Sequence, residues 1–391
     1  MLPSYEGIAV LIMIRVEVIQ DPSEFDKLEP AWTQLLSKSR CNSITLTWEW
    51  MRTWWTIYHE RRRLCLITVY DNGRLIGMAP MLSRCKPLLH YRVLPFRRIE
   101  LLASGEESGH RVCSDYIDWI AEAGRESEVI SNILDYLCHE LSSEWEELVL
   151  PDLSEESPNI PPLRRETQRR HLKFEITNRE PCSIIRLPET WDAFLNNVSS
   201  GLRYKIRRGR RELAKLDGVY HVITHPSELE EAIDALIQLH QQRWTAKGES
   251  GAFASRKRTL FHQVFIPIAL RENWLRLGLL KVNGQPIGAI YNFQYNGKIY
   301  FYQSGILIPD DQHLRPGLLM HSFEVEWAIN AGYREYDFLK RGHSDYKEAW
   351  ATNRRNLLCI RIAKPGVKET ALECAHLLYE RMRVVKHQIF G

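Results

Sequence analysis

The sequence predicts an α/β (α+β) fold made of two successive modules, and three observations support this prediction. The chain has 391 residues, which is long enough for two hydrophobic cores. Its composition, 44% hydrophobic and 26% charged, is ordinary for a folded globular protein. The stretches "VYDNGRLIGMAPML" and "KVNGQPIGAIYNF" each contain a strand, an Asn-Gly turn and a strand opened by Ile-Gly. This parallel indicates that the second half repeats the plan of the first.

The first half is expected to alternate strands and helices around a hairpin at Asn72-Gly73, because both positions of such a turn favour positive φ. The expected elements are, in order, a strand (Arg15 to Ile19), a helix (about Pro22 to Lys38), the hairpin, a helix (Glu126 to Leu141) and a strand (Glu146 to Leu150). Four aromatic residues of "TWEWMRTWWTIY" are interpreted as core, with a sugar-stacking cleft between modules as the alternative. They are Trp48, Trp50, Trp54 and Trp55.

Residues 151–181 contain several prolines and a charged run, and we expect them to connect the modules, with room for a helix and a strand. The second half then contains a strand in "CSIIRL", a helical stretch "TWDAFLNNVSSGLRYKIRRGRRELAKL", a strand in "VYHVIT" and two further helices. Strands joined by Asn283-Gly284 and Asn296-Gly297 follow, and then a helix (Leu318 to Asn330) and a strand (Glu335 to Leu339).

Charge and cysteine usage narrow the class of protein. The net charge is only +3, so we expect no DNA partner, and any affinity for phosphate must come from a local patch. The eight cysteines are scattered singly without metal-ligand spacing, which predicts reduced thiols, no metal and a cytoplasmic location. No transmembrane span is expected, because no apolar run reaches the ~18 residues it needs. The apolar segment from Ile8 to Ile14 is interpreted as a strand, and either Met1 or Met13 as the start.

The motif Arg315-Pro316-Gly317 stands at the mouth of an apolar helix. Unpaired N–H groups and the helix dipole make such a terminus a phosphate-binding position. Pro316 lacks an N–H that the first turn does not need, and Gly317 lets a ligand approach the backbone. An ordinary helix start without a ligand is the alternative.

The segments around this motif resemble a known family. "YNF", "IYFYQSGI", "RPGLL", "AINAGYREYDFLKRG" and "YKEAW" occur in the order found in GNAT-fold acyltransferases of the CelD/BcsL type, relatives of the Fem-type aminoacyltransferases. "LRYKIRRGRRELAKL", "LHQQRWTAKG" and "TWEWMRTWW" are similar to other parts of it. The resemblance implies tandem GNAT-like modules, each a mixed, largely antiparallel sheet flanked by helices. They would be a degenerate module (14–160), an acyltransferase module with the cofactor site (183–364) and a C-terminal amphipathic helix (365–391).

The resemblance also implies the position of an acyl-CoA co-substrate. Its thioester would lie beside the strand from Ile299 to Ser304, where backbone N–H groups can stabilise the developing oxyanion. The residues expected to bind the cofactor are Arg315, Gly317, Leu318, Leu319 and Ser304.

Direct attack of an amine on the thioester needs a proton acceptor and a proton source for the leaving thiolate. The catalytic candidates are Asp337, Tyr346, Lys347, His343 and Tyr302. Asp337 closes a strand beside the expected cleft, with a loop-bracing role as the alternative. Tyr346 and Lys347 match a Gly-x-x-x-Tyr-Lys pattern of the family, and a solvated surface position is the alternative for Lys347.

The helix that follows Ser199 is strongly basic, and its apolar residues share one face, so its cations are expected to point outward. They would steer an anionic acceptor, a CoA 3′-phosphate, lipid headgroups or tRNA, and a solvated face is the alternative. The residues expected to contact substrate are Arg203, Lys205 and Arg207 of this helix, and Arg243 and Trp244 of the next.

The predicted function is N-acylation of an amine on a small-molecule or carbohydrate-linked acceptor by acyl-CoA, without a covalent intermediate, in polysaccharide or cell-envelope biosynthesis. O-acylation remains open. One alternative is a Fem-like enzyme that uses aminoacyl-tRNA, and another is a non-catalytic scaffold of a polysaccharide-biosynthesis assembly. The C-terminal helix is expected to cap the domain, with peripheral membrane contact as the alternative.

Overall fold

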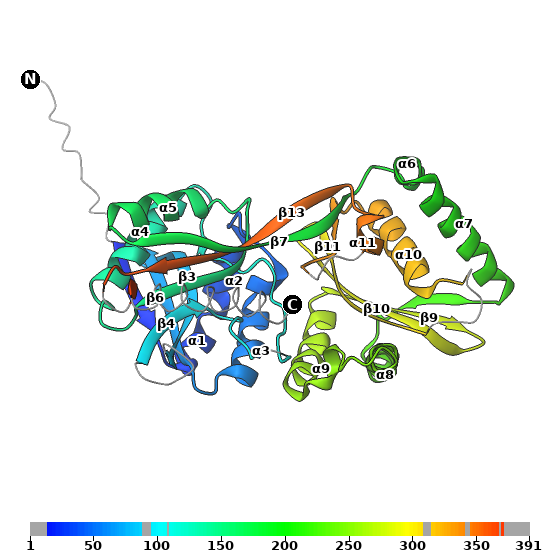
Figure 1. The fold of residues 1–391 in the computed structure, drawn as a ribbon, viewed down its shortest axis with the longest axis horizontal. Helices are drawn as coiled ribbons and strands as arrows, with labels where there is room; N and C mark the ends of the chain where they lie inside the picture. The colour runs from blue at the N-terminus through cyan, green and yellow to red at the C-terminus, as the bar shows by residue number, and fades with distance from the viewer. Residues whose placement is uncertain are drawn as a thin grey trace, which may run out of the picture.

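The computed structural model describes residues 14–87, 95–107, 109–307, 314–340, 345–366 and 369–370. His343, the apolar segment before Ile14 and most of the expected C-terminal helix lie outside the described residues. The described chain forms a thirteen-stranded mixed sheet with helices on both faces, drawn out into two halves (Figure 1). The expected α/β (α+β) fold is thereby confirmed.

The first half of the sheet is a four-stranded antiparallel arrangement followed by a parallel β-α-β unit. Its elements are β1 (Ile14–Ile19), α1 (Pro22–Lys27), α2 (Glu29–Ser37), α3 (Trp48–Tyr58), β2 (Arg63–Asp71), β3 (Arg74–Pro87), β4 (Pro95–Leu101), β5 (Ile120–Ala121), α4 (Glu126–Cys138), β6 (Glu147–Ser154), α5 (Ile160–Arg169) and β7 (Lys173–Arg186).

The second half repeats this plan. Its elements are α6 (Trp191–Asn197), α7 (Ser200–Lys215), β8 (Val219–Val222), α8 (Leu229–Thr245), α9 (Arg256–Arg271), β9 (Leu275–Val282), β10 (Gln285–Tyr295), β11 (Lys298–Ile306), α10 (Pro316–Asn330), β12 (Glu335–Asp337), α11 (Asp345–Glu348) and β13 (Asn353–Ala363). Strands β8 to β11 are antiparallel neighbours, and β12 returns through α10 to lie parallel to β11. In the first half, β6 likewise returns through α4 to lie parallel to β4, so the two halves share the same topology.

Two long strands, β7 and β13, extend between the two halves and join them into one continuous sheet (Figure 1). β7 pairs with β13 along its length, and its last residues also pair with β12. β13 in turn pairs with β6 of the first half. The stretch 151–181 is therefore more than a connection, since it contains α5 and part of β7. Because the sheet is continuous, the module limits 14–160 and 183–364 stay a prediction.

Local sequence explains the hairpins that fix the register. Asn72, Asn283 and Asn296 have φ of 48°, 51° and 47°, and the glycine after each also has positive φ. Such turns match the twist of the paired strands. The register of β9, β10 and β11 that follows places the end of β11 next to α10.

The aromatic stretch of α3 forms core, as expected for Trp50, Trp54 and Trp55, which are buried. Trp50 packs edge-on against Phe261 and Phe265 of α9 at 4.8 Å between ring centroids. The two halves therefore share one apolar interior where α3 meets α9. A second core lies on the opposite face of the sheet, under α6, α7 and α10.

Candidate active site

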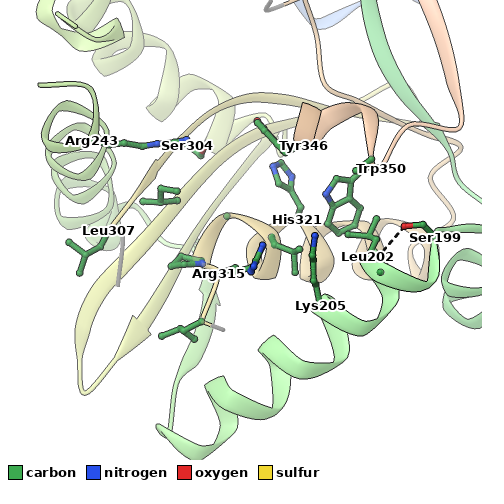
Figure 2. Close-up of a pocket in the computed structure, with 17 residues that line it drawn as sticks. Ser199, Leu202, Lys205, Arg243, Ser304, Leu307, Arg315, His321, Tyr346 and Trp350 are labelled. Atoms are coloured by element: carbon green, nitrogen blue, oxygen red, sulfur yellow. Dashed lines mark hydrogen bonds between the residues drawn. The ribbon is translucent and has the colours of Figure 1, made fainter. Parts of the chain in front are cut away.

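A cavity of about 730 Å³ opens in the second half, between α7, α10, α11 and the end of β11 (Figure 2). Its polar lining comes from five elements or their ends: Ser199, Lys205, Arg243, Ser304, Arg315, His321 and Tyr346. Apolar residues complete it, including Leu202, Ile306, Leu314 and Trp350. Of the residues expected at the cofactor, Ser304, Arg315, Gly317 and Leu318 line this space.

The cavity is positively charged. Lys205, Arg243 and Arg315 approach it from three separate segments, and Figure 2 shows Arg243 reaching from α8 toward Ser304. In the described part of the chain, no aspartate or glutamate lines it. Cations brought together from three separate segments favour a ligand with several negative charges.

Two helices begin at this cavity, which adds to its positive potential. α10 starts at Pro316 with Arg315 as its N-cap, and the Arg315 side chain does not cap the first N–H groups. α7 starts after Ser199, whose hydroxyl accepts a hydrogen bond of 3.2 Å from the Leu202 N–H. Among the residues that the structure describes, a Cβ on Gly317 would approach no atom closer than 3.8 Å, so glycine leaves this turn open toward Ile306. The N-termini of two long helices thus face one space.

The sheet separates beside the cavity. β11 and β12 pair only over Lys298–Tyr300 and Glu335–Asp337, whereas β11 continues to Ile306 along β10. Ser304 lies beyond Tyr300, the last residue of β11 that pairs with β12. Its N–H donates a hydrogen bond of 3.1 Å to the side-chain oxygen of Gln303. A side-chain acceptor can be displaced by a ligand carbonyl without breaking the sheet, so this N–H is a candidate oxyanion donor.

His321 was missed by sequence reasoning. It lies one turn after Gly317 on α10, is 2% exposed, and its Nδ1 lies 2.9 Å from the Tyr336 hydroxyl oxygen. Burial, with a smaller contribution from Lys347, lowers the pKa of His321 to about 3. The imidazole is therefore neutral at pH 7. The spacing of four residues from Gly317 was the available signal, because residues i and i+4 share a helix face.

Replacing His321 by Asn is expected to flatten the acid dependence of stability. The folded-state pKa lies below the ordinary 6.5, so the unfolded chain binds the proton first and stability falls as the pH drops from about 6.5 toward 3. Between pH 7 and pH 5 the loss attributable to this group is about 2 kcal/mol. Urea unfolding at both pH values checks this. An equal loss in parent and variant would contradict it.

Asp337 does not lie beside the cleft, which corrects the expectation. It is fully buried and accepts hydrogen bonds from the hydroxyl of Tyr116 and from the Leu339 N–H, while Arg355 lies 3.7 Å away. Burial raises the pKa of Asp337. Because Tyr116 belongs to the first half, the structure places this carboxyl group at the contact between the halves and outside the cavity lining.

Tyr302 and Lys347 are also absent from the described cavity lining. The Tyr302 ring packs against Trp50, and its hydroxyl donates to the backbone oxygen of Val112. Lys347 is 5% exposed and donates to the Phe338 oxygen at 2.9 Å, so the surface position is also wrong for it. Tyr346 alone of the described catalytic candidates lines the cavity, and His343 lies outside the described residues.

The residues predicted to bind cofactor or substrate also fall into two groups, inside and outside the cavity lining. Lys205 and Arg243 line the cavity. Leu319 is buried in the core, and Trp244 is half-buried on α8 away from the lining. Arg203 and Arg207 lie on α7 outside the lining, where Arg207 is exposed.

The corresponding helix terminus in the described part of the first half is closed by a side chain. This helix, α4, begins with Glu126, whose carboxylate accepts from the Gly124 N–H at 3.0 Å and pairs with Arg40 at 2.7 Å. A carboxylate of the chain itself thus occupies the place near the dipole where an anion would bind.

Known proteins resemble this chain in sequence and fold. Residues 200–348 match the model of the Acetyltransferase (GNAT) domain. The structure of FemX is similar over 88% of this chain and 96% of its own, with 11% identity and a TM-score of 0.57. The structure of a conserved protein of unknown function from Bacteroides thetaiotaomicron is similar over 90% of this chain and 100% of its own, with 12% identity and a TM-score of 0.53. No curated protein matches the sequence.

The matched domain contains the α10 terminus, the end of β11 and Lys205 of α7, which all line the cavity, and the same topology occurs in both halves of the sheet. The CelD/BcsL type stays a prediction. No helix in the described residues combines the length and apolar character needed to cross a membrane. Residues 200–348 are thus similar to a GNAT acetyltransferase domain, and over most of its length the chain shares its fold with FemX.

Proposed function

We propose that this chain transfers an acyl group from acyl-CoA to an amine acceptor. The observation that carries the proposal is the cavity itself, in which two helix N-termini meet Lys205, Arg243 and Arg315 without an acidic residue in its described lining. The pyrophosphate and 3′-phosphate of CoA supply several negative charges on one small molecule. The match to a GNAT acetyltransferase domain supports acyl transfer as the chemistry.

The positions of the lining residues suggest their roles. The pyrophosphate would bind the amides of Gly317 and Leu318, with Arg315 beside it. The acyl carbonyl would then reach Ser304, whose N–H would exchange Gln303 for the oxyanion. The acceptor nitrogen forms a bond to the carbonyl carbon as the carbon–sulfur bond breaks. Its surplus proton leaves to solvent, and the hydroxyl of Tyr346 protonates the thiolate and then takes up a proton from solvent.

One observation favours a second donor, aminoacyl-tRNA. Five cations of α7 form no ion pair with any described residue: Arg203, Lys205, Arg207, Arg208 and Arg211. Arg210 does not point outward as expected, because its guanidinium group pairs with Glu326 at 2.6 Å and packs on the Phe323 ring. A row of cations along α7, of which Lys205 reaches the cavity, suits a longer polyanion such as RNA.

An amine-dependent release of CoA thiol is the expected result when the protein is mixed with acetyl-CoA or longer acyl-CoAs and a panel of amines and amino sugars. Thiol release is followed with a colorimetric reagent, and product formation by mass spectrometry. Ribonuclease should leave the activity unchanged. The same amines are offered with charged tRNA in parallel. Transfer from charged tRNA alone would replace the proposal by the second one, and no transfer from either donor would contradict both.

A further inference from the structure

Two basic runs far apart in the sequence meet at a second cavity. The run Arg61–Arg63 follows α3, and the run Arg256–Arg258 opens α9. Members of both line a cavity of about 470 Å³ together with Arg84 of β3. It shares no lining residue with the cavity at α10, so it is a separate site. Figure 1 shows α3 and α9 next to each other, where the two halves meet.

The charges of this cavity are poorly balanced. Five cations line it, namely Arg61, Arg62, Arg84, Arg256 and Lys257, against the carboxylates of Glu60 and Glu107. Behind the lining, Arg84 is paired with the buried carboxylate of Glu100 at 2.7 Å. Glu60 is engaged by Lys257 at 2.6 Å. Arg61 and Arg256 are exposed and form no ion pair within the described part of the chain. Three consecutive cations in the first turn of α9 also oppose the helix dipole, which favours anions at that end.

Hydrogen bonds hold the walls of this cavity in place. His110 Nδ1 lies 2.7 Å from the hydroxyl of Ser255, the N-cap of α9. Arg62 and Arg84 both donate to the Gly105 oxygen, at 3.0 and 2.8 Å. The guanidinium groups of Arg61 and Arg256 thus stand beside a braced wall and have donors to spare.

An apolar groove continues from this cavity between α3 and α9. It has a volume of about 680 Å³ and shares Glu60, Arg256 and Lys257 with the basic cavity. Its apolar lining consists of Trp48, Ile57, Leu260, Val264 and Ile268. Leu260 and Val264 are 44% and 43% exposed, which is unusual for adjacent apolar side chains on one helix.

We propose that the basic cavity and the α3–α9 groove together bind one amphiphilic ligand, a lipid phosphate. Its phosphate head contacts Arg61 and Arg256 in the cavity, and its chain covers Leu260 and Val264 in the groove. A phosphate head satisfies cations that have no carboxylate partner, and an apolar chain removes the exposed side chains from water. Because the cavity and the groove share lining residues, one ligand can occupy both, with its phosphate in the cavity and its chain in the groove. This site does not depend on the acyl transfer proposed above.

Calorimetric titration with monododecyl phosphate, below its micelle concentration, tests this proposal, with inorganic phosphate as the second probe. Both titrations contain excess CoA, so that the α10 cavity is filled and does not contribute to the binding of either probe. We expect saturable binding of one dodecyl phosphate, at least tenfold tighter than inorganic phosphate, because two buried methylene groups already correspond to roughly tenfold. The variant Arg61→Ser with Arg256→Ser should weaken both probes at least tenfold, since each loses charge-assisted hydrogen bonds.

The variant Leu260→Ser with Val264→Ser separates chain from head. It should weaken dodecyl phosphate at least about fivefold and leave inorganic phosphate unchanged. Arg179→Ser, an exposed position on β7, and Arg315→Ala, in the other cavity, should both bind dodecyl phosphate as the parent does. Equal affinity for the two probes, unchanged binding in the Arg61/Arg256 variant, or loss of binding in Arg315→Ala would each overturn the proposal. Circular dichroism confirms the fold of every variant.

Discussion

CoA is expected to bind the double variant Arg315→Ala with Gly317→Trp at least about 100-fold more weakly than the parent. Arg315 supplies a charge-assisted hydrogen bond, whose loss alone typically costs about tenfold or more. Gly317 keeps the first turn of α10 open, since Ile306 is the only described residue within 4 Å of the position of a Cβ there. An indole at this position would fill the space where the pyrophosphate meets the backbone. Calorimetric titration with CoA measures the change.

The single variant Gly317→Ala is the matched control. The added methyl group makes only ordinary contacts with Ile306 at 3.8 and 3.9 Å, and the backbone there does not have positive φ. We therefore expect Gly317→Ala to fold like the parent and to bind CoA within a few-fold of it. If the Trp variant retained parental affinity, the phosphate position at α10 would be wrong.

Replacing Arg276 by Met should lower the free energy of unfolding by about 3–5 kcal/mol. Arg276 donates two hydrogen bonds, of 2.7 and 3.1 Å, to the fully buried carboxylate of Glu324 on α10. Asn292 and Tyr220 complete the shell at 3.0 and 2.7 Å. Without Arg276 the charge of Glu324 stays in the interior with neutral donors only. Urea unfolding at pH 7 gives the difference.

Two comparisons make this stability prediction sharp. Lys215→Met breaks the exposed pair with Glu212 on α7, so it should change stability by less than about 1 kcal/mol. Adding Glu324→Leu to Arg276→Met removes both buried charges and should restore part of the lost stability. A double variant less stable than Arg276→Met would show that the unpaired carboxylate is not the cause of the loss.

Short sequence motifs correctly predicted those parts of the cavity wall that depend on backbone conformation. The Asn-Gly turns at Asn283 and Asn296 fix the β9–β11 register, and the motif at Arg315 starts a helix where sequence alone placed it. Such features depend on φ preferences and on residues within one turn. The second helix terminus was also predicted from the sequence, because Ser199 precedes the basic helix as a capping residue, and its hydroxyl accepts a hydrogen bond from the Leu202 N–H. The break between α6 and α7 just before it was not predicted.

Side-chain direction could not be predicted from the sequence. Asp337 ends a strand near the cavity, but its carboxyl group faces Tyr116, which lies in the other half of the chain. Tyr302 lies on β11 with Ser304, yet it faces the shared core around Trp50. Which face of a strand is buried depends on the partner module, and no pattern within β11 or β12 contains that information.

The measurement that tests the central claim most directly is a calorimetric titration of the full chain with CoA. We predict one saturable site per chain whose affinity falls as salt concentration rises, because Lys205, Arg243 and Arg315 contribute by charge. Desulfo-CoA should bind nearly as well, since the phosphates supply most of the contacts. Absence of binding by well-folded protein would contradict the assignment of this cavity to acyl-CoA.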